Sequence, residues 1–231
     1  MGLYHNPSCV TDGLVLALDA ANRRSYSGTG TNWSDISTSL NNGTLTNGPT
    51  YGSTNGGIIS FDGLDDFVQV NSSNNFPSGS AARSICIAFI PTQINVRRNC
   101  LFFHGNVDIN QGFMVSSHTD GKRTQVQAYS NQASAYSNTD WVVNKLNHIV
   151  VTFNGTTITY YINGVADGTA TFSTTINTVN SVNPRIASYP SGWGGESPSQ
   201  GQIGSIFMYN ICLTASQVQQ NFNALRGRFG I

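Results

Sequence analysis

The chain has 231 residues, of which 39% are hydrophobic and only 10% are charged, and eleven basic side chains balance eleven acidic ones. This length suits one all-β sandwich domain of ~200–250 residues, and the zero net charge argues against a nucleic-acid partner. The start, MGLYHNPSCVTDG, lacks the basic and apolar regions of a signal peptide, and no segment approaches the ~18 apolar residues of a membrane span. We therefore expect synthesis in the cytoplasm and no membrane partner.

Short apolar runs separated by turn residues follow one another along the chain. GLVLALD, from residue 13 to 19, predicts a first strand, and the polar, glycine-rich loop after it is expected to be anchored on the core by Trp33 and Ile36. Two short strands are predicted around Asp62-Gly63, in IISFDG and DDFVQV. Further strands are predicted in SICIAFI, NCLFFHG, GFMVSSH, TQVQAYS and QIGSIFMYNICL. Such a succession is typical of a β-sandwich.

The segment HIVVTFNGTTITYYINGV, residues 148–165, carries the strongest local signal. Apolar and polar residues alternate in its strands, as expected for a sheet with one apolar face. Asn154-Gly155 and Asn163-Gly164 both predict type I′ hairpin turns, because these residues tolerate positive φ. Two successive hairpins make a meander, so the class is antiparallel β.

One helix is expected, near the end of the chain. Thr214 can cap its start with Gln217 three positions later, which is a capping box, and Gly227 supplies the stop. The apolar face of this helix would contain Val218, Phe222 and Leu225. No repeat or linker divides the sequence, so we expect a single domain over 1–231, with a core from about 10 to 225 and short extensions at both ends.

The cysteines and histidines do not form a recognisable metal site. The cysteines are widely separated, without a CxxC pair, which favours four buried thiols and leaves one disulfide as an alternative. The histidines have neither HxH nor HExxH spacing, and those at strand ends favour a structural role. These residues are Cys9, Cys86, Cys100 and Cys212, and His5, His104, His118 and His148.

Catalytic groups are scarce. A glycosidase normally needs two carboxyl groups that face the scissile bond, whereas the one glutamate, Glu196, lies in a glycine-rich loop. Asp65 and Asp66 are adjacent, so on a strand they would point to opposite faces. No GxSxG elbow marks a nucleophile. We expect a protein that is not an enzyme.

Two places are candidates for ligand binding. Asp62, Asp65 and Asp66 crowd one turn and could hold Ca²⁺, but the favoured interpretation is an Asx-turn at Asp62, so no cofactor is expected. Tyr189 and Trp193 lie in SYPSGWGGESPSQG, where aromatic rings among small residues could bind a carbohydrate. Alternatively, Trp193 holds the loop in place or faces a neighbouring subunit.

Three segments together resemble a known family. IISFDGLDDFVQV, NHIVVTFNGTTITYYINGVADGT and IGSIFMYNICLTASQVQQNFNAL are similar to motifs of the laminin-G-like, concanavalin A-like lectin/glucanase superfamily. This resemblance covers about residues 58 to 225 and implies an all-β, two-sheet antiparallel jelly-roll sandwich with one short C-terminal helix. It also implies binding to carbohydrate or to protein. The Glu-x-Asp-x-x-Glu strand of the glucanase branch has no counterpart here, which argues against hydrolysis.

The two ends resemble a narrower group. PSCVTDGLVLALDAANRRSYSGTGTNWSDIS and NFNALRGRFGI are similar to segments of virion proteins of tailed phages and their prophage relatives. This resemblance implies a structural virion protein, used as a capsid decoration, fibre or tail-associated component, with other virion proteins and copies of itself as partners. The alternative is a glycan-binding adhesion module that recognises host-surface carbohydrate. A hydrolase is the third and weakest hypothesis.

Overall fold

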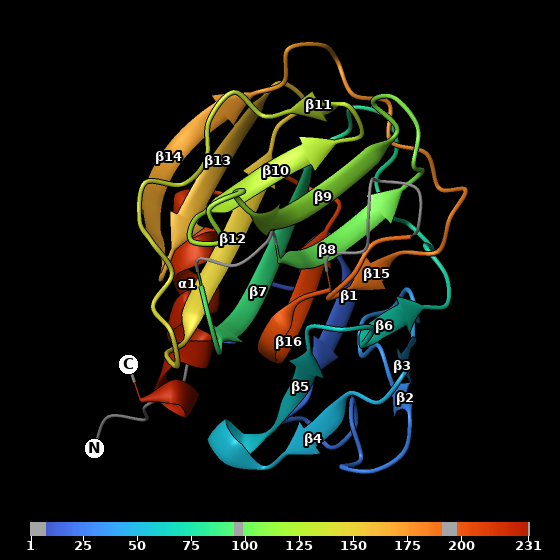
Figure 1. The fold of residues 1–231 in the computed structure, drawn as a ribbon, viewed down its shortest axis with the longest axis vertical. Coiled ribbons are helices and arrows are strands. Elements are labelled where there is room, and N and C mark those ends of the chain that lie inside the picture. The colour runs from blue at the N-terminus through green and yellow to red at the C-terminus, as the bar shows by residue number, and fades with distance from the viewer. Residues whose placement is uncertain (1–7, 95–98, 191–197, 231) are drawn as a thin grey trace.

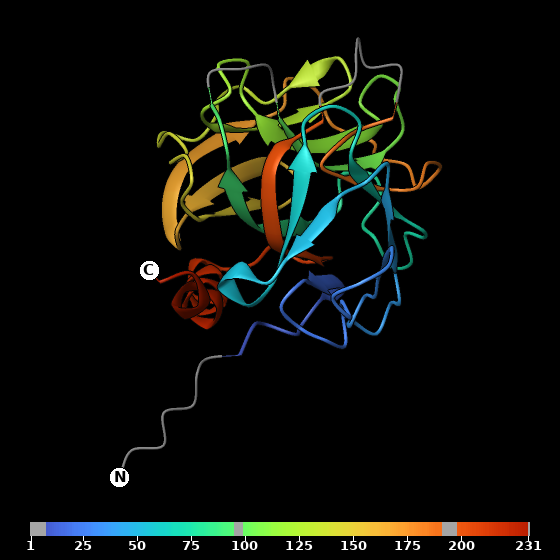
Figure 2. The ribbon, with the colours of Figure 1, turned by 60° about the horizontal axis from the view of Figure 1, so that its bottom comes forward.

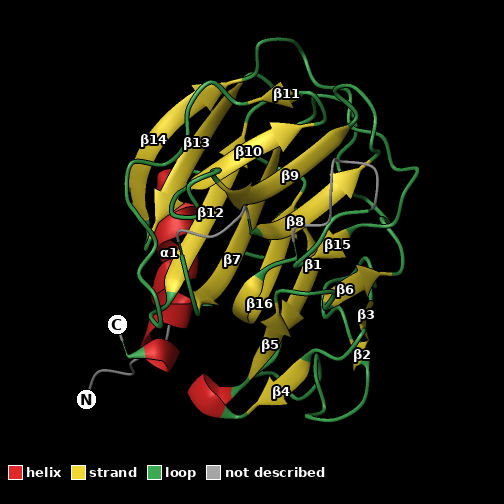
Figure 3. Ribbon diagram, in the orientation of Figure 1, coloured by secondary structure: helices red, strands yellow, loops and turns green. Residues whose placement is uncertain are grey.

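Two antiparallel β-sheets stack face to face (Figures 1 and 3). The structure is a computed structural model that describes residues 8–94, 99–190 and 198–230. Sheet A has the order β14 (Val165–Thr171), β13 (Thr157–Ile162), β12 (Asn147–Phe153), β7 (Arg83–Pro91), β16 (Gln200–Tyr209), β5 (Ile58–Asp62) and β4 (Thr50–Gly52), with β1 (Leu14–Asp19) also beside β16. Sheet B has the order β11 (Asn131–Gln132), β10 (Thr124–Ala128), β9 (Gly112–Ser117), β8 (Cys100–Gly105), β15 (Arg185–Ile186), β6 (Phe67–Val70), β3 (Gly43–Thr46) and β2 (Asn32–Trp33).

Strand β16 is the centre of sheet A. Along one edge it pairs with β7, from Gly201 to Tyr209. Along its other edge it pairs first with β5 and then with β1, which lie end to end. A single strand near the end of the chain therefore joins three strands that all lie within the first 91 residues.

The inner faces of the two sheets form the hydrophobic core. Trp33 is fully buried in this core, so the prediction that it anchors its loop is confirmed. The prediction for Ile36 was wrong, because its side chain is 41% exposed. The backbone N–H of Ile36 donates instead to the carbonyl of Ala17, and Tyr26 joins Trp33 as a second buried aromatic side chain of the loop.

The predicted meander is present as β12, β13 and β14, but its two turns differ. Asn163 and Gly164 both have positive φ, 52° and 81°, in a two-residue loop, as predicted. At the other turn only Gly155 has positive φ, so the type I′ prediction was wrong there. The loop is longer by one residue, and Asn154 Oδ1 closes it by accepting from the backbone N–H of Thr156 and of Thr157.

Helix α1 (Ala215–Arg226) packs on the outer face of sheet A (Figure 2). The predicted capping box between Thr214 and Gln217 is confirmed. Gly227 does not stop the helix in a left-handed conformation: its φ is −59°, and the chain continues into the 3₁₀ helix η2 (Gly227–Phe229) before Gly230 turns left-handed. No helix among the described residues is long and apolar enough to cross a membrane.

The four cysteines form no disulfide within the described part of the chain. Cys86 and Cys100 are buried, as predicted, whereas Cys9 and Cys212 are half-buried. The prediction of four buried thiols was thus wrong for Cys9 and Cys212. Cys9 lies in the N-terminal segment and Cys212 lies shortly before α1, whereas Cys86 and Cys100 lie on β7 and β8.

The turn after Asp62 carries the chain from one sheet to the other. β5 belongs to sheet A and β6 to sheet B, so these two strands are not hairpin partners although they follow one another. A short 3₁₀ helix, η1 (Thr54–Gly56), precedes β5. The Asp62–Asp66 turn consequently lies at an edge of the sandwich, where side chains from both sheets meet.

Candidate functional site

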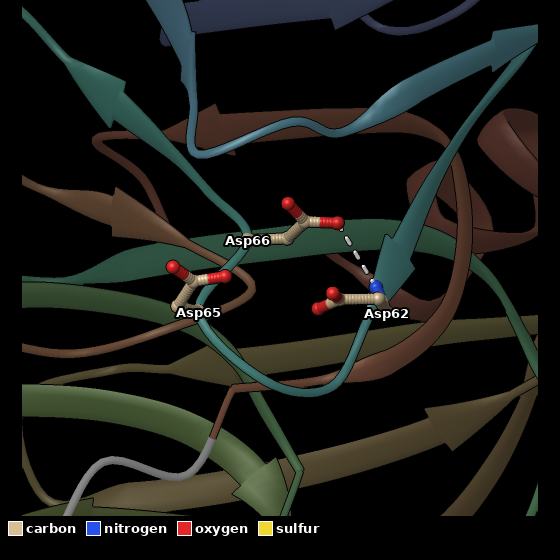
Figure 4. A group of neighbouring side chains, drawn as sticks. All are labelled: Asp62, Asp65 and Asp66. Carbon is tan, nitrogen blue, oxygen red and sulfur yellow. Dashed lines mark hydrogen bonds between the residues drawn. The ribbon is translucent and has the colours of Figure 1, made fainter.

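The turn between β5 and β6 brings three carboxylates together, as Figure 4 shows. One oxygen from each of Asp62, Asp65 and Asp66 lies within 4.8 Å of the others. Sequence reasoning treated Asp65 and Asp66 as strand residues that point apart, and this was wrong because both lie in the turn before β6. There the backbone curves, and their carboxylates converge.

Hydrogen bonds within the turn support its shape. Asp62 Oδ1 accepts from the backbone N–H of Leu64 at 2.8 Å, which is the expected Asx-turn. Asp66 Oδ2 accepts from the backbone N–H of Asp62 at 3.0 Å. Burial raises the pKa of the Asp66 carboxyl, and the nearby charges of Asp62 and Asp65 act in the same direction. The cluster therefore has a structural role whether or not it binds anything.

These carboxylates could supply three of the ~6–8 oxygen ligands that Ca²⁺ prefers. Asp62 and Asp65 are exposed, but Asp66 is 4% exposed and already holds the Asp62 N–H. The turn can thus contribute part of a cation shell. Calcium at this turn stays the untested alternative to the structural interpretation that the sequence favours.

A cavity of about 310 Å³ opens beside the same turn. It lies where β5, β16 and the segments flanking β7 and β8 approach one another. Gln200, the first residue of β16, pairs with Asp62, the last residue of β5. The cavity is lined by Asp62, Gly63, Leu64, Gln93, Asn99, Pro198 and Gln200.

Asn99 contributes a buried polar group to this cavity. Its side chain is 2% exposed, and its Oδ1 accepts from the backbone N–H of Gln200 at 3.0 Å. Its backbone N–H donates to Ser117 Oγ at 2.8 Å. Its Nδ2 has no hydrogen-bond partner among the described residues. Most buried polar groups are paired in native proteins, so this amide is an exception that needs an explanation.

A second hollow, of about 240 Å³, lies at the end of the meander. Phe172 is half-buried there and surrounded by hydroxyl-bearing side chains. Its ring packs edge-on against Phe113 and Phe153. Because these contacts belong to the core cluster, this hollow is a smaller and less distinct candidate.

The aromatic pair predicted from the sequence is only partly within the described structure. Tyr189 is 5% exposed and packs with Cys100, Phe103 and Met114 on the outer face of sheet B. A buried ring offers little surface for stacking on a sugar. Trp193 lies outside the described residues, as does Glu196, and carbohydrate contact at Trp193 stays a prediction.

Asn99 was not singled out from the sequence. The residue precedes a strand and belongs to no motif, and its side chain matters only because Gln200, 101 positions later, binds its carbonyl oxygen. No local signal could have identified it. The Asp62–Asp66 cluster, in contrast, is contained in five consecutive residues and was found.

The sequence matches one family model over residues 61–219, which is more than half of the chain. The chain belongs to the concanavalin A-like lectin/glucanases superfamily. This confirms the family resemblance and, with the two-sheet topology, the all-β jelly-roll sandwich. Among curated proteins, none matches the chain.

Solved structures share the fold of this superfamily member at low sequence identity. Domain 4 of AbnA, an extracellular arabinanase from Geobacillus stearothermophilus in complex with arabinotriose, is 17% identical with a TM-score of 0.70, covering 92% of this chain and 99% of the domain. A Trypanosoma rangeli sialidase mutant that displays trans-sialidase activity is 14% identical with a TM-score of 0.65, covering 95% of this chain but 34% of the sialidase. Botulinum neurotoxin type C, whose cell entry depends on interaction with two ganglioside molecules, is 14% identical with a TM-score of 0.66, covering 92% of this chain and 51% of the toxin chain.

Proposed function

We propose that this lectin-like sandwich is a carbohydrate-binding module without catalytic activity. The observation that carries the proposal is the similarity to the whole of the arabinanase domain, which was solved with arabinotriose bound. The toxin depends for its cell entry on gangliosides, which carry sugars. Both relatives thus interact with a molecule that contains carbohydrate, and a fold of this kind supports binding without fixing which sugar is bound.

The groups around the larger cavity agree with binding rather than hydrolysis. Amide side chains and one carboxylate line it, and these are groups that exchange hydrogen bonds with sugar hydroxyls. Hydrolysis of a glycosidic bond normally needs two carboxyl groups facing the bond. Among the described lining residues only Asp62 is acidic. This supports the proposal that the protein is not an enzyme.

A structural role in a tailed-phage virion is the second candidate. It is favoured by the resemblance of residues 7–37 and 221–231 to virion proteins of such phages. In that setting the sandwich would be a capsid decoration, a fibre or a tail-associated protein, made in the host cytoplasm and surrounded by other virion proteins. A module of this kind on a particle surface could also recognise host-surface carbohydrate, so both candidates can apply to one protein.

A glycan array tests the first candidate. We expect saturable binding of the full chain to a subset of neutral oligosaccharides, with arabinotriose included, and displacement by the same sugar in solution. Incubation with each bound oligosaccharide should release no new reducing ends. The absence of binding across the array would contradict the proposal, and released sugar would contradict its non-enzymatic part. Mass spectrometry of purified phage particles tests the virion role separately.

A further inference from the structure

We propose that the hollow at the end of the meander is a carbohydrate-binding site for one neutral sugar ring, with Phe172 against the C–H groups of the ring and the oxygens of the rim as acceptors for its hydroxyl groups. This inference rests on the proposed function and assigns it to named residues. The hollow is smaller than the cavity at the β5–β6 turn, but an aromatic side chain lines it. Its volume of about 240 Å³ lies just below the ~300–1,000 Å³ of pockets that enclose drug-sized ligands, which suits one ring of an oligosaccharide.

The hollow lies where the chain crosses from one sheet to the other. Thr171, the last residue of β14, pairs with Thr157 at the start of β13, beside the turn that follows β12. The next residue, Phe172, forms an antiparallel bridge with Ala133, which follows β11 of sheet B. Both sheets therefore fix the position of this segment. The hollow is lined by Phe153, Gly155, Thr156, Thr171, Phe172, Ser173, Thr174, Thr175 and Ile176.

The first argument is the half-buried ring of Phe172. On its inner side the ring packs edge-on against Phe113 of sheet B and Phe153 of sheet A, with centroid distances of 6.4 and 5.9 Å. The core thus covers only part of this side chain, and the rest stays in contact with water. A ligand with an apolar face gains free energy by covering that surface. Because two packed rings hold Phe172, little conformational entropy is lost on binding.

The second argument is the set of hydroxyl groups on the exposed rim. A hydroxyl donates one hydrogen bond and accepts two. Three of the five rim hydroxyls donate to a side-chain amide oxygen of the protein, so they offer a ligand only acceptor positions. Thr171 and Thr175 carry the other two, and both side chains are exposed. The three committed bonds run from Thr156 to Asn154, from Ser173 to Asn131 and from Thr174 to Asn110, at 3.0, 2.9 and 3.3 Å.

One buried amide, that of Asn131, fixes this part of the rim. Its side chain is 4% exposed, and its Oδ1 accepts from Ser173 Oγ. Its Nδ2 donates to the carbonyl of Thr174 at 2.9 Å and to Asn110 Oδ1 at 2.8 Å. Ser173 and Thr174 are thereby held on both sides of Phe172's neighbouring peptide groups and of the hollow before any ligand arrives, which reduces the entropic cost of binding.

The charges around the hollow favour a neutral ligand that donates hydrogen bonds. None of the described residues that line it is charged. The Arg83 guanidinium lies 5.9 Å from the centroid of the Phe153 ring, but it is fully buried and donates to three protein oxygens. A cation would find no carboxylate here, and a carboxylate or sulfate group would bring acceptors against acceptors. A sugar brings hydroxyl donors around its edge and C–H groups on its faces, which matches both the rim and Phe172.

The test measures binding of arabinotriose and of the neutral oligosaccharide that binds most strongly on the array, by calorimetry in EDTA and again in Ca²⁺. Phe172→Leu keeps an apolar contact with the core but removes the flat ring, and it should weaken binding about tenfold or more. Thr171→Val combined with Thr175→Val removes two exposed hydroxyls at nearly constant volume and should weaken binding about fivefold or more. The matched control, Thr169→Val, makes the same change at an exposed position of β14 outside the lining and should stay within about twofold.

Each remaining result contradicts the assignment in a distinguishable way. If the wild-type chain binds these sugars and both variants bind equally well, the site lies elsewhere while the proposed function stands. Loss of binding only in Trp193→Ala or only in Asp62→Asn would place it on that loop or at the β5–β6 turn. Loss of binding in EDTA would show that a cation holds the sugar. Circular dichroism checks that Phe172→Leu folds, and the double threonine variant, on exposed side chains, tests the site independently: wild-type affinity in that variant would contradict the contacts with the rim. If the wild-type chain binds no glycan, both proposals fail.

Discussion

The His148 side chain is buried, and the loss of contact with water controls the protonation of its ring. It lies fully buried at the start of β12, with its ring 5.7 Å from that of Phe222 on α1. Neither ring nitrogen has a hydrogen-bond partner within the described residues. Burial lowers the pKa of His148 from 6.5 to about 4, because the charged imidazolium would be stripped of solvent.

This burial predicts a pH dependence of stability. The unfolded chain binds a proton at His148 near pH 6.5 and the folded chain only near pH 4, so stability is lost as pH falls from 6.5 to 4. The loss from this group is roughly 3 kcal/mol, at ~1.36 kcal/mol per pKa unit. His148→Leu should therefore flatten the urea midpoint as a function of pH in this window.

The measurement has a built-in reference. At pH 8 the His148 ring is neutral in both the folded and the unfolded chain, so its protonation does not contribute to the free energy of unfolding. Any difference in stability between the variant and wild type at this pH therefore reports packing alone. Part of the slope should remain in the variant, because burial also lowers the pKa of His104, to about 3. Parallel pH profiles for variant and wild type would show that His148 is not the titrating group.

A residue whose role depends on its neighbours in the chain could be predicted from the sequence, whereas a residue whose role depends on distant segments could not. The Asx-turn at Asp62 involves neighbours in the chain, and so does the capping box at Thr214. Asn99 and His148 acquire their properties from segments many positions away, which no window of sequence contains. The crowding of Asp62, Asp65 and Asp66 in one turn was predicted, and only the placement of Asp65 and Asp66 on a strand was wrong, since it depends on where β6 begins.

Among the elements, α1 is attached to the sandwich by a polar group inside an apolar interface. Asn221 is fully buried, and its Oδ1 accepts from the backbone N–H of Val10 at 2.8 Å. Its Nδ2 donates to Tyr209 Oη at 3.1 Å, and that hydroxyl donates to the carbonyl of Val10 at 3.0 Å. One side chain thereby joins the N-terminal segment, β16 and the helix.

Removing this group should destabilise the protein. Asn221→Ala leaves the Val10 N–H buried without its acceptor, and an unpaired buried group costs ~1–3 kcal/mol. We expect a lower urea midpoint with an unchanged m-value. The control Asn223→Ala removes an amide two positions away, where the bond from Gln219 Nε2 is only part-buried, and should have a small effect. Equal losses in both variants would contradict the role of Asn221.

The helix itself was predictable, and its attachment was not. Capping and the spacing of Val218 and Leu225 are properties of consecutive residues, and both are buried as expected. Asn221 falls between them and, in a segment rich in amides, resembles a surface residue. Its burial depends on Val10, 211 positions earlier in the chain. The same holds for the meander, whose strands were correct while the type of one turn was wrong.

Across the whole molecule, the protection of backbone amides from hydrogen exchange should depend on where each strand lies in its sheet. β7, β12 and β16 are central in sheet A and paired on both edges, whereas β2, β4 and β11 are edge strands of two or three residues. Amide hydrogen exchange should be slowest in the first group and fastest in the second, since edge strands open without global unfolding. Mass spectrometry of exchanged peptides measures this order. Protection of β4 equal to that of β7 would contradict it.

The fold class and the family could be predicted from the sequence, but the sheet order could not. Turn residues and alternation mark the strands, because each strand is a local pattern. Which strands pair depends on packing between distant segments. The crossing of the chain from sheet A to sheet B at Asp62 was therefore missed, and with it the cavity at that edge.

The central position of β16 has a consequence for biosynthesis. β1, β5 and β7 all leave the ribosome before their common partner exists, because β16 begins at Gln200 in a chain of 231 residues. Until then the nascent chain exposes unpaired strand edges and apolar faces, which are the features that chaperones and proteases bind. Gln200 also lines the cavity. A translation product that stops before Gln200 would accordingly be cleared as misfolded rather than survive as a partial sandwich.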